Sequence, residues 1–156
     1  MAKMIGYMLT WRTYGTWLQG DERGYVKDGQ LLNKNETLEQ VNKTNLKKQP
    51  IKFDTKQKEI VKDSIVQEAK RLRQKVIALT VSSSHIHLLV NKTSESIETA
   101  AALYKTAART ALNKNGLEGK VWSKGYDKRF CFNSQELNNR IEYIREHQKN
   151  NETTKK

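Results

Sequence analysis

The sequence predicts an α+β fold, a ferredoxin-like antiparallel sheet in βαββαβ order with an added C-terminal helix. Its apolar patterns alternate as strand, helix, strand, strand, helix, strand and helix. Only a tight serine turn separates the two middle strands, which favours an antiparallel pair. The chain has 156 residues, a length typical of one domain with a single core. We therefore expect one domain over residues 1–151.

The first half of the chain contains one strand, a long polar segment and one helix. Residues 4–12 are apolar and aromatic enough for a first strand. The segment that follows carries four glycines and ends at Pro50, so we expect a long loop with a polar insertion at about 27–50. Residues 55–75 predict a helix, because apolar residues recur at helical spacing. The residues of this apolar stripe are Val61, Ile65, Ala69 and Leu72.

A predicted hairpin and a second helix follow. Residues 76–84 and 85–91 are rich in β-branched and apolar residues and predict two paired strands. Residues 94–116 predict a helix with acidic residues in its first turn, and Gly116 ends it. Two serines could cap this helix, Ser94 or Ser96.

The last part of the chain predicts a strand and a terminal helix. Residues 120–132 contain short strand-like pieces around Gly125. Residues 134–151 predict a helix with Ser134 as its cap, and we expect a disordered tail at 152–156. The apolar stripe of this helix is expected to consist of Leu137, Ile141 and Ile144.

The charge of the chain indicates a polyanionic partner. Lys and Arg number 29 against 17 Asp and Glu, which gives a formal net charge of +12. Nucleic acid is the first candidate and a membrane surface is the alternative. No apolar run approaches the roughly 20 residues needed to span a bilayer, and the N-terminus does not resemble a signal peptide. With the single cysteine Cys131, these features predict a cytoplasmic protein without an internal disulfide.

Two of the three histidines in the chain, His85 and His87, lie in one predicted strand. Side chains alternate along a strand, so both imidazoles point to one face while Ile86 points to the other. Their backbone positions are about 6.5–7 Å apart, which lets both imidazoles converge on one metal ion. The alternative is two ordinary histidines on the surface of a sheet.

The third histidine, His147, lies in the predicted terminal helix. Tyr143 precedes it by four residues, so the two side chains share one face of the helix. Because helical side chains lean toward the N-terminus, Tyr143 can lie beside whatever His147 binds. The alternative is a half-buried tyrosine next to a surface histidine.

The residues around the histidines resemble the HUH single-strand transposases, and most of all the REP-associated tyrosine transposases. The resemblance rests on SSSHIHLLV at 82–90, followed by YIREHQ at 143–148 in a terminal helix. LTWRTYGTWLQGDERG at 9–24 and VWSKGYDKRF at 121–130 also resemble segments of that family. The insertion from Lys27 to Pro50 does not.

The resemblance implies a metal-dependent transposase that cleaves and rejoins hairpin-bearing single-stranded DNA. Family members hold a divalent ion with the paired histidines, here His85 and His87, and attack DNA with one tyrosine, here Tyr143, to form a 5′-phosphotyrosine. A third ligand commonly follows the tyrosine by one helical turn and is often Asn or Gln. This chain has His147 at that position and Gln148 beside it, so either could be the ligand.

The resemblance also implies the cofactor and the oligomeric states to expect. Magnesium is the usual ion of the family, but three imidazoles form a softer set, so the ion is expected to be magnesium or manganese, and zinc could occupy the site in a crystal. Related enzymes include dimers that exchange the tyrosine helix. The sequence is therefore compatible with a monomer or a homodimer.

Basic and aromatic residues offer contacts for DNA. Basic side chains can bind phosphates and aromatic rings can stack on unpaired bases. The candidates for phosphate contacts are Arg12, Lys124, Lys128, Arg129 and Arg140, with Lys105 and Arg109 in addition. The candidates for stacking are Trp11, Tyr14, Trp17, Trp122 and Tyr126. Many of these side chains could instead belong to the core or to ordinary surface.

Other functions compete with this hypothesis. A non-catalytic or domesticated nucleic-acid-binding protein would carry the same charge, and a metal-dependent nuclease could use the same histidines. Histidine-triad enzymes need another histidine after the pair, where this chain has Leu88, Leu89 and Val90. The two-histidine phosphoesterases need two separate His-x-Ser/Thr motifs, which this sequence lacks.

Overall fold

A computed structural model describes residues 3–16, 26–27, 30–31 and 50–153. Within the predicted insertion, β2 (Val26–Lys27) pairs in antiparallel fashion with β3 (Gln30–Leu31). The rest of the insertion lies outside the described residues, as does the end of the predicted tail, residues 154–156.

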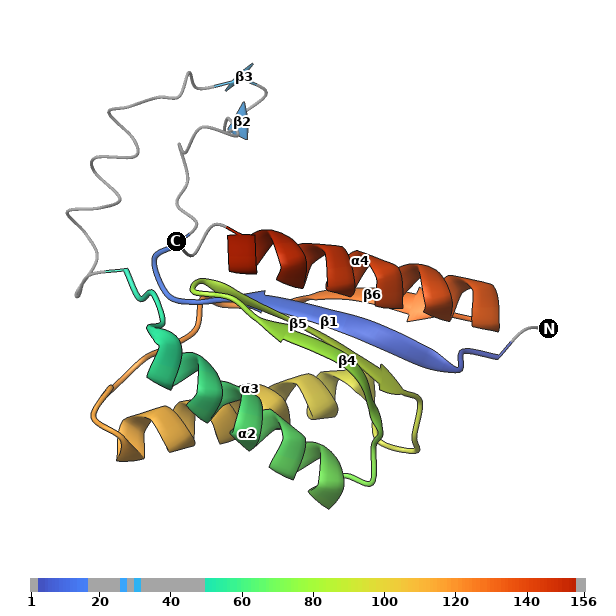
Figure 1. The fold of residues 1–156 in the computed structure, drawn as a ribbon, viewed down its shortest axis with the longest axis horizontal. Coiled ribbons are helices and arrows are strands. Elements are labelled where there is room, and N and C mark those ends of the chain that lie inside the picture. Colours follow the sequence, from blue (N-terminus) through green and yellow to red (C-terminus); the bar gives the residue numbers. More distant parts are fainter. Residues whose placement is uncertain (1–2, 17–25, 28–29, 32–49, 154–156) are drawn as a thin grey trace.

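The main sheet has four strands in the order β4-β5-β1-β6, and every neighbouring pair is antiparallel. Helices α2 and α3 cover one face and α4 covers the other (Figure 1). This arrangement confirms the predicted ferredoxin-like fold with an added C-terminal helix. The strands are β1 (Gly6–Arg12), β4 (Val76–Val81), β5 (His85–Asn91) and β6 (Asp127–Cys131). The helices are α2 (Thr55–Arg71), α3 (Ile97–Lys114) and α4 (Ser134–Thr153).

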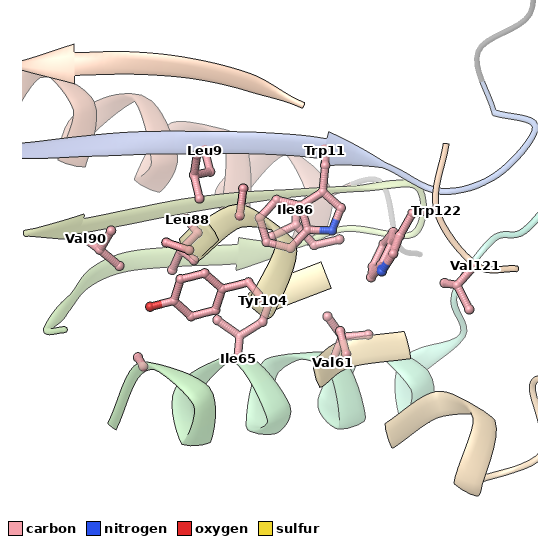
Figure 2. Packing of buried hydrophobic residues seen from close by; sticks show 14 of the residues in the cluster. Leu9, Trp11, Val61, Ile65, Ile86, Leu88, Val90, Tyr104, Val121 and Trp122 are labelled. Carbon is pink, nitrogen blue, oxygen red and sulfur yellow. The ribbon is translucent and has the colours of Figure 1, made fainter. Parts of the chain in front are cut away.

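The larger core lies between the sheet and helices α2 and α3. Alternate residues of β1 and β5 point into it, as the period of two along a strand requires (Figure 2). The predicted stripe of α2 faces the same core, with three of its residues buried and Leu72 packed at the edge. The strand residues are Leu9, Trp11, Ile86, Leu88 and Val90, and the buried stripe residues are Val61, Ile65 and Ala69.

A buried polar group lies within this core. The side-chain amide of Gln74 donates to the hydroxyl of Tyr7 (2.9 Å) and to the carbonyl of Asn91 (2.9 Å). The hydroxyl of Tyr104 donates to the Gln74 carbonyl oxygen (2.7 Å). Burial raises the pKa of Tyr104, so its hydroxyl stays protonated and can donate. Gln74 therefore links β1, the end of β5 and α3 through satisfied hydrogen bonds.

Helices α2 and α4 differ from the sequence prediction at their ends. Helix α2 ends at Arg71, four residues early, because Arg73 has a left-handed φ of 59° that a continuing helix does not allow. Helix α4 is capped by Asn133 and not by Ser134, since the Asn133 side chain accepts from the backbone N–H of Glu136 (2.8 Å). At its other end α4 extends to Thr153, two residues past the predicted end.

Helix α3 is shorter than the predicted range 94–116, but the residues predicted to cap it and to end it take those positions. Ser96, one of the two candidate caps, accepts from the backbone N–H of Thr99 (3.1 Å). Gly116 follows the helix with a φ of 103°, a left-handed conformation that glycine adopts without a steric penalty.

A smaller apolar cluster joins α4 to the opposite face of the sheet. Met8, Leu89, Cys131 and Ile144 are buried there. The other two residues of the predicted stripe, Leu137 and Ile141, pack against them, which confirms the stripe. None of the helices in the described part of the chain combines the length and the apolar character needed to cross a bilayer.

Candidate active site

The histidine pair lies at the end of β5, on the face of the sheet that α4 covers. Residues directly opposed in an antiparallel pair place their side chains on one face. Thr10 of β1 is opposite His87, and Arg12 is opposite His85. The next pair along this face is Met8 with Leu89, which belongs to the smaller apolar cluster. On this face, the row with Met8 and Leu89 is apolar, and the two rows with the histidines, Thr10 and Arg12 are polar.

All three histidines of the chain meet at this polar end. His85, His87 and His147 each offer a ring nitrogen, and these nitrogens lie within 4.8 Å of one another. Ring centroids are 5.0 Å apart for His85 and His87, and 4.6 Å from each of them to His147. The Nε2 atoms of His85 and His147 are in direct contact. Gln148, the alternative ligand, is exposed.

The donor set fits a divalent metal ion. Zn²⁺ binds imidazole nitrogen at about 2.0–2.1 Å in a tetrahedral site, which sets two such nitrogens roughly 3.3 Å apart. The three nitrogens are close enough to reach that spacing with small side-chain adjustments. Imidazole ligands suit Mn²⁺ or Zn²⁺ better than Mg²⁺, which prefers oxygen.

The environment keeps the imidazoles neutral, which is the form that binds metal. Burial, with the nearby charges of His147 and Arg12, lowers the pKa of His85 to about 4. Burial, with the other two histidines and Arg12, lowers the pKa of His87 to about 3. The pKa of His147 is also lowered, first by burial and then by Arg12. At neutral pH all three nitrogens are therefore available as ligands.

Two hydroxyl groups hold the outer ring nitrogens of the histidine pair. Thr10 Oγ1 is 2.8 Å from His87 Nδ1, and Ser82 Oγ is 2.9 Å from His85 Nδ1. The sequence prediction missed both residues. Ser82 could have been considered from its place three residues before His85, but the pairing of Thr10 with His87 depends on a strand register that no local pattern specifies.

Tyr143 borders the histidine cluster and remains reachable from solvent. Its ring centroid is 5.3 Å from that of His87 and 6.1 Å from that of His147, on which it stacks at 19°. The side chain is 46% exposed. The other serious tyrosine candidate, Tyr126, packs against the larger core.

Of the predicted phosphate contacts, Arg12 and Lys124 lie nearest the histidine end of the sheet. Arg12 is close enough to lower the pKa of all three histidines. Exposed Lys124 follows Ser123, whose backbone N–H donates to the Arg12 carbonyl (3.0 Å). The loop that carries Lys124 is thereby fixed to the end of β1.

The other three predicted contacts are dispersed. Arg129 is opposite Met8 on the α4 face of β6 and forms an ion pair with Asp127 (3.0 Å). Lys128 points to the other face of the sheet and pairs with Glu98 of α3 (3.3 Å). Arg140 precedes His147 by seven residues, about 10 Å along the helix axis. The five basic residues therefore do not form one continuous patch, and their contacts with DNA stay predictions.

The prediction of base stacking is wrong for two tryptophans. Trp11 and Trp122 are 1% and 6% exposed, and their rings pack edge to face in the larger core, 5.8 Å apart. Neither ring offers a face to a base. Tyr14 is half-buried with the Lys120 amine 5.0 Å above its ring, and Trp17 lies outside the described residues.

Lys105, the additional phosphate candidate on α3, has a structural role. Its amine donates to the carbonyls of Ser123 (3.2 Å) and Gly125 (3.0 Å), which fixes the loop before β6. Burial lowers its pKa, with a smaller effect from Lys120.

Solved structures share this fold, although no family model and no curated protein matches the sequence. One is the structure of a REP-associated tyrosine transposase bound to a REP hairpin. It is 12% identical with a TM-score of 0.56, over 92% of this chain and 67% of that chain. Another is the "crystal structure of a putative transposase" from Deinococcus radiodurans R1, 16% identical with a TM-score of 0.50, over 95% of this chain and 93% of that one.

The fold and the histidine cluster thus define an α+β protein with a candidate metal centre, and its structural neighbours are transposases. The resemblance to REP-associated tyrosine transposases that the sequence shows is confirmed at the level of the fold.

Proposed function

We propose that this protein is a metal-dependent single-stranded DNA transposase that uses Tyr143 as its nucleophile. One observation carries the proposal: all three histidines of the chain and an exposed tyrosine gather at one place between β5 and α4. The fold around them is the fold of a REP-associated tyrosine transposase. A metal-binding group beside an accessible hydroxyl is what transesterification of a phosphodiester requires.

The proposed reaction is an exchange of phosphate esters without hydrolysis. The Tyr143 oxygen attacks a DNA phosphorus, and the bond from that phosphorus to the 3′ oxygen of the preceding nucleotide breaks. The phenolic proton is lost to solvent and the leaving 3′ oxygen takes up a proton. The product is a 5′-phosphotyrosine. Another 3′ hydroxyl can attack its phosphorus in turn, which breaks the bond to the Tyr143 oxygen, releases the protonated tyrosine and rejoins the strand.

The side chains of the site divide this work. His85, His87 and His147 would hold the divalent ion, which supplies positive charge beside the reacting phosphate. Arg12, on the same sheet face as the histidines, would contact a phosphate oxygen. Tyr143 needs no large movement to meet a substrate, because nearly half of its side chain is already exposed.

The substrate that we propose is single-stranded DNA carrying a hairpin. The net charge of +12 favours a polyanion, and the neighbour of known structure is described as bound to a REP hairpin. The exposed position of Tyr143 suits a flexible strand that can bend its backbone into the site. Binding should favour a single strand with a hairpin over blunt duplex of equal length.

The test is covalent capture of a labelled hairpin oligonucleotide. Wild type, Tyr143→Phe and the control Tyr126→Phe are each incubated with 5′- and 3′-labelled DNA and Mn²⁺, and the products are run on a denaturing gel. We expect an adduct with wild type and with Tyr126→Phe, and none with Tyr143→Phe, whose DNA binding should stay nearly intact. An adduct that persists in Tyr143→Phe and vanishes in Tyr126→Phe would overturn the assignment.

The same gel separates the proposal from its main alternative, a metal-dependent nuclease. The histidine cluster could serve hydrolysis without any role for Tyr143. Cleavage by wild type with no covalent adduct, unchanged in Tyr143→Phe, would identify a nuclease. Repeating the reaction with Mg²⁺ tests the ion, and we expect slower cleavage because three imidazoles favour Mn²⁺.

A further inference from the structure

Each histidine of the pair has its outer ring nitrogen beside a hydroxyl group. The Nδ1 of His87 is 2.8 Å from Thr10 Oγ1, and the Nδ1 of His85 is 2.9 Å from Ser82 Oγ. The Nε2 of His85 points the other way and contacts His147. The two Nδ1 atoms thus point outward and leave the Nε2 side for the centre of the cluster.

The direction of the Ser82 hydrogen bond can be worked out from its other contacts. The Ser82 hydroxyl has a single proton, and the carbonyl of His85 accepts from it at 3.0 Å. If that proton is used there, the ring nitrogen must donate, so His85 carries its proton on Nδ1. Nε2 is then left with a free lone pair, which is what a metal ligand needs.

We propose that Thr10 and Ser82 are positioning residues that fix the tautomer and the ring orientation of His87 and His85 for metal binding through Nε2. The proposal rests on the proposed function, in which these histidines hold a divalent ion. A histidine bound to metal generally donates its other ring N–H to a neighbouring acceptor, which fixes the ring and strengthens the ligand. In this proposal strand β1 would supply one acceptor, Thr10, and the turn before β5 would supply the other, Ser82.

The two residues differ in how cleanly they can be tested. Ser82 also closes the turn, because its backbone N–H donates to the His85 carbonyl (2.9 Å) and its hydroxyl accepts from the His85 backbone N–H (3.1 Å). Its loss could therefore disturb the hairpin itself. The Thr10 side chain has no such second contact among the described hydrogen bonds, so Thr10→Val removes the hydroxyl and keeps the shape.

The structure offers a matched control in the same row of the sheet. Thr80 of β4 is opposite His87 on the side away from Thr10. Thr80 is buried, whereas Thr10 is half-buried, and the Nδ1 atom of His87 has its hydroxyl partner in Thr10. Thr80→Val therefore makes the same chemical change beside the same histidine without touching the proposed contact.

The experiment is a titration of the full chain with Mn²⁺, with the free ion followed by electron paramagnetic resonance. We expect Thr10→Val to bind Mn²⁺ about 10–100-fold more weakly than wild type, the usual effect of losing such an outer contact. Thr80→Val should bind as wild type does, and Thr10→Ser should restore binding because it restores the hydroxyl. Equal affinity of wild type and Thr10→Val, or equal weakening in both valine variants, would overturn the proposal.

A second measurement reads the tautomer without metal. The ¹⁵N chemical shifts of the His87 ring should show the proton on Nδ1 in wild type and a shift toward the Nε2-protonated form in Thr10→Val. Ser82→Ala should do the same for His85, whereas the neighbouring Ser83→Ala should not. Unchanged shifts would refute the positioning role even if metal binds. Failure of wild type to bind Mn²⁺ would instead refute the metal centre, and the positioning proposal with it.

Discussion

Acid should destabilise the metal-free protein between pH 7 and pH 5, and the histidine cluster should cause most of the loss. The chain has only three histidines, and all of them lie in this cluster. Histidine is the only side chain whose ordinary pKa lies between 5 and 8, although a thiol with a lowered pKa can also titrate in this range. The pKa of the single cysteine, Cys131, is raised by burial and moves away from this range. A pH titration of stability therefore reports on this one site.

The size of the effect follows from the lowered pKa values. At pH 5 an imidazole of the unfolded chain is almost fully protonated, whereas His85, with a pKa of about 4, and His87, with a pKa of about 3, remain mostly neutral. The unfolded chain binds more protons, so the free energy of unfolding falls as the pH falls below 6.5. Integration from pH 7 to pH 5 gives roughly 2 kcal/mol for each of the two imidazoles, hence about 2–4 kcal/mol for the coupled pair.

The assay is urea unfolding at pH 7, 6 and 5 in the presence of a chelator. With a slope of about 2 kcal/mol per molar urea, we expect the midpoint to fall by about 1–2 M. The control is the double variant His85→Gln, His87→Gln, in which most of this pH dependence should be gone. A double variant that loses as much stability as wild type between pH 7 and pH 5 would refute the reasoning, because the titrating groups would then lie elsewhere.

Further outcomes are expected from the core, the electrostatics and the DNA interface. Gln74→Leu should lower the free energy of unfolding by about 2–5 kcal/mol in urea titrations, because the buried hydroxyls of Tyr7 and Tyr104 lose their partner; a loss under about 1 kcal/mol would contradict this. Arg12→Gln should raise the pKa of all three histidines in an NMR titration, while Lys124→Gln should not. If six phosphates are neutralised, the log–log salt slope of single-strand binding should be about -4, and a flat response would count against a DNA substrate.

The sequence by itself determined the order of the helices and strands. It also determined which side chains share a face of the histidine strand and which side of α2 is buried. A period of two places His85 and His87 on one face and Ile86 on the other, whatever the rest of the fold does. The apolar stripe of α2 is equally local, since its spacing reports which side of the helix must be buried. These features are short-range consequences of backbone geometry, and the structure confirms them.

Only the tertiary structure decided which side chains surround the histidines. Thr10 reaches His87 because of the register between β1 and β5, and a slip by one residue would have turned Thr10 to the other face. Lys128 is directed away from the site for the same reason, by the register of β6 on β1. Composition made both Lys128 and Trp122 candidates for contacts with DNA. In the structure Trp122 is buried and cannot stack on a base, and Lys128 forms an ion pair with Glu98.

The histidine cluster itself combines both kinds of information. The sequence supplies two imidazoles on one strand face, and it supplies Tyr143 and His147 one helical turn apart. Their meeting depends on α4 packing across the face opposite to α2 and α3, through Ile144 and its neighbours. His85 and His147 are 62 positions apart in the chain, so no local pattern could fix their contact. Long-range packing decided this contact. The apolar stripe of α4 is buried against the one apolar sheet face that α2 and α3 do not cover, and this brings His147 to the histidine pair.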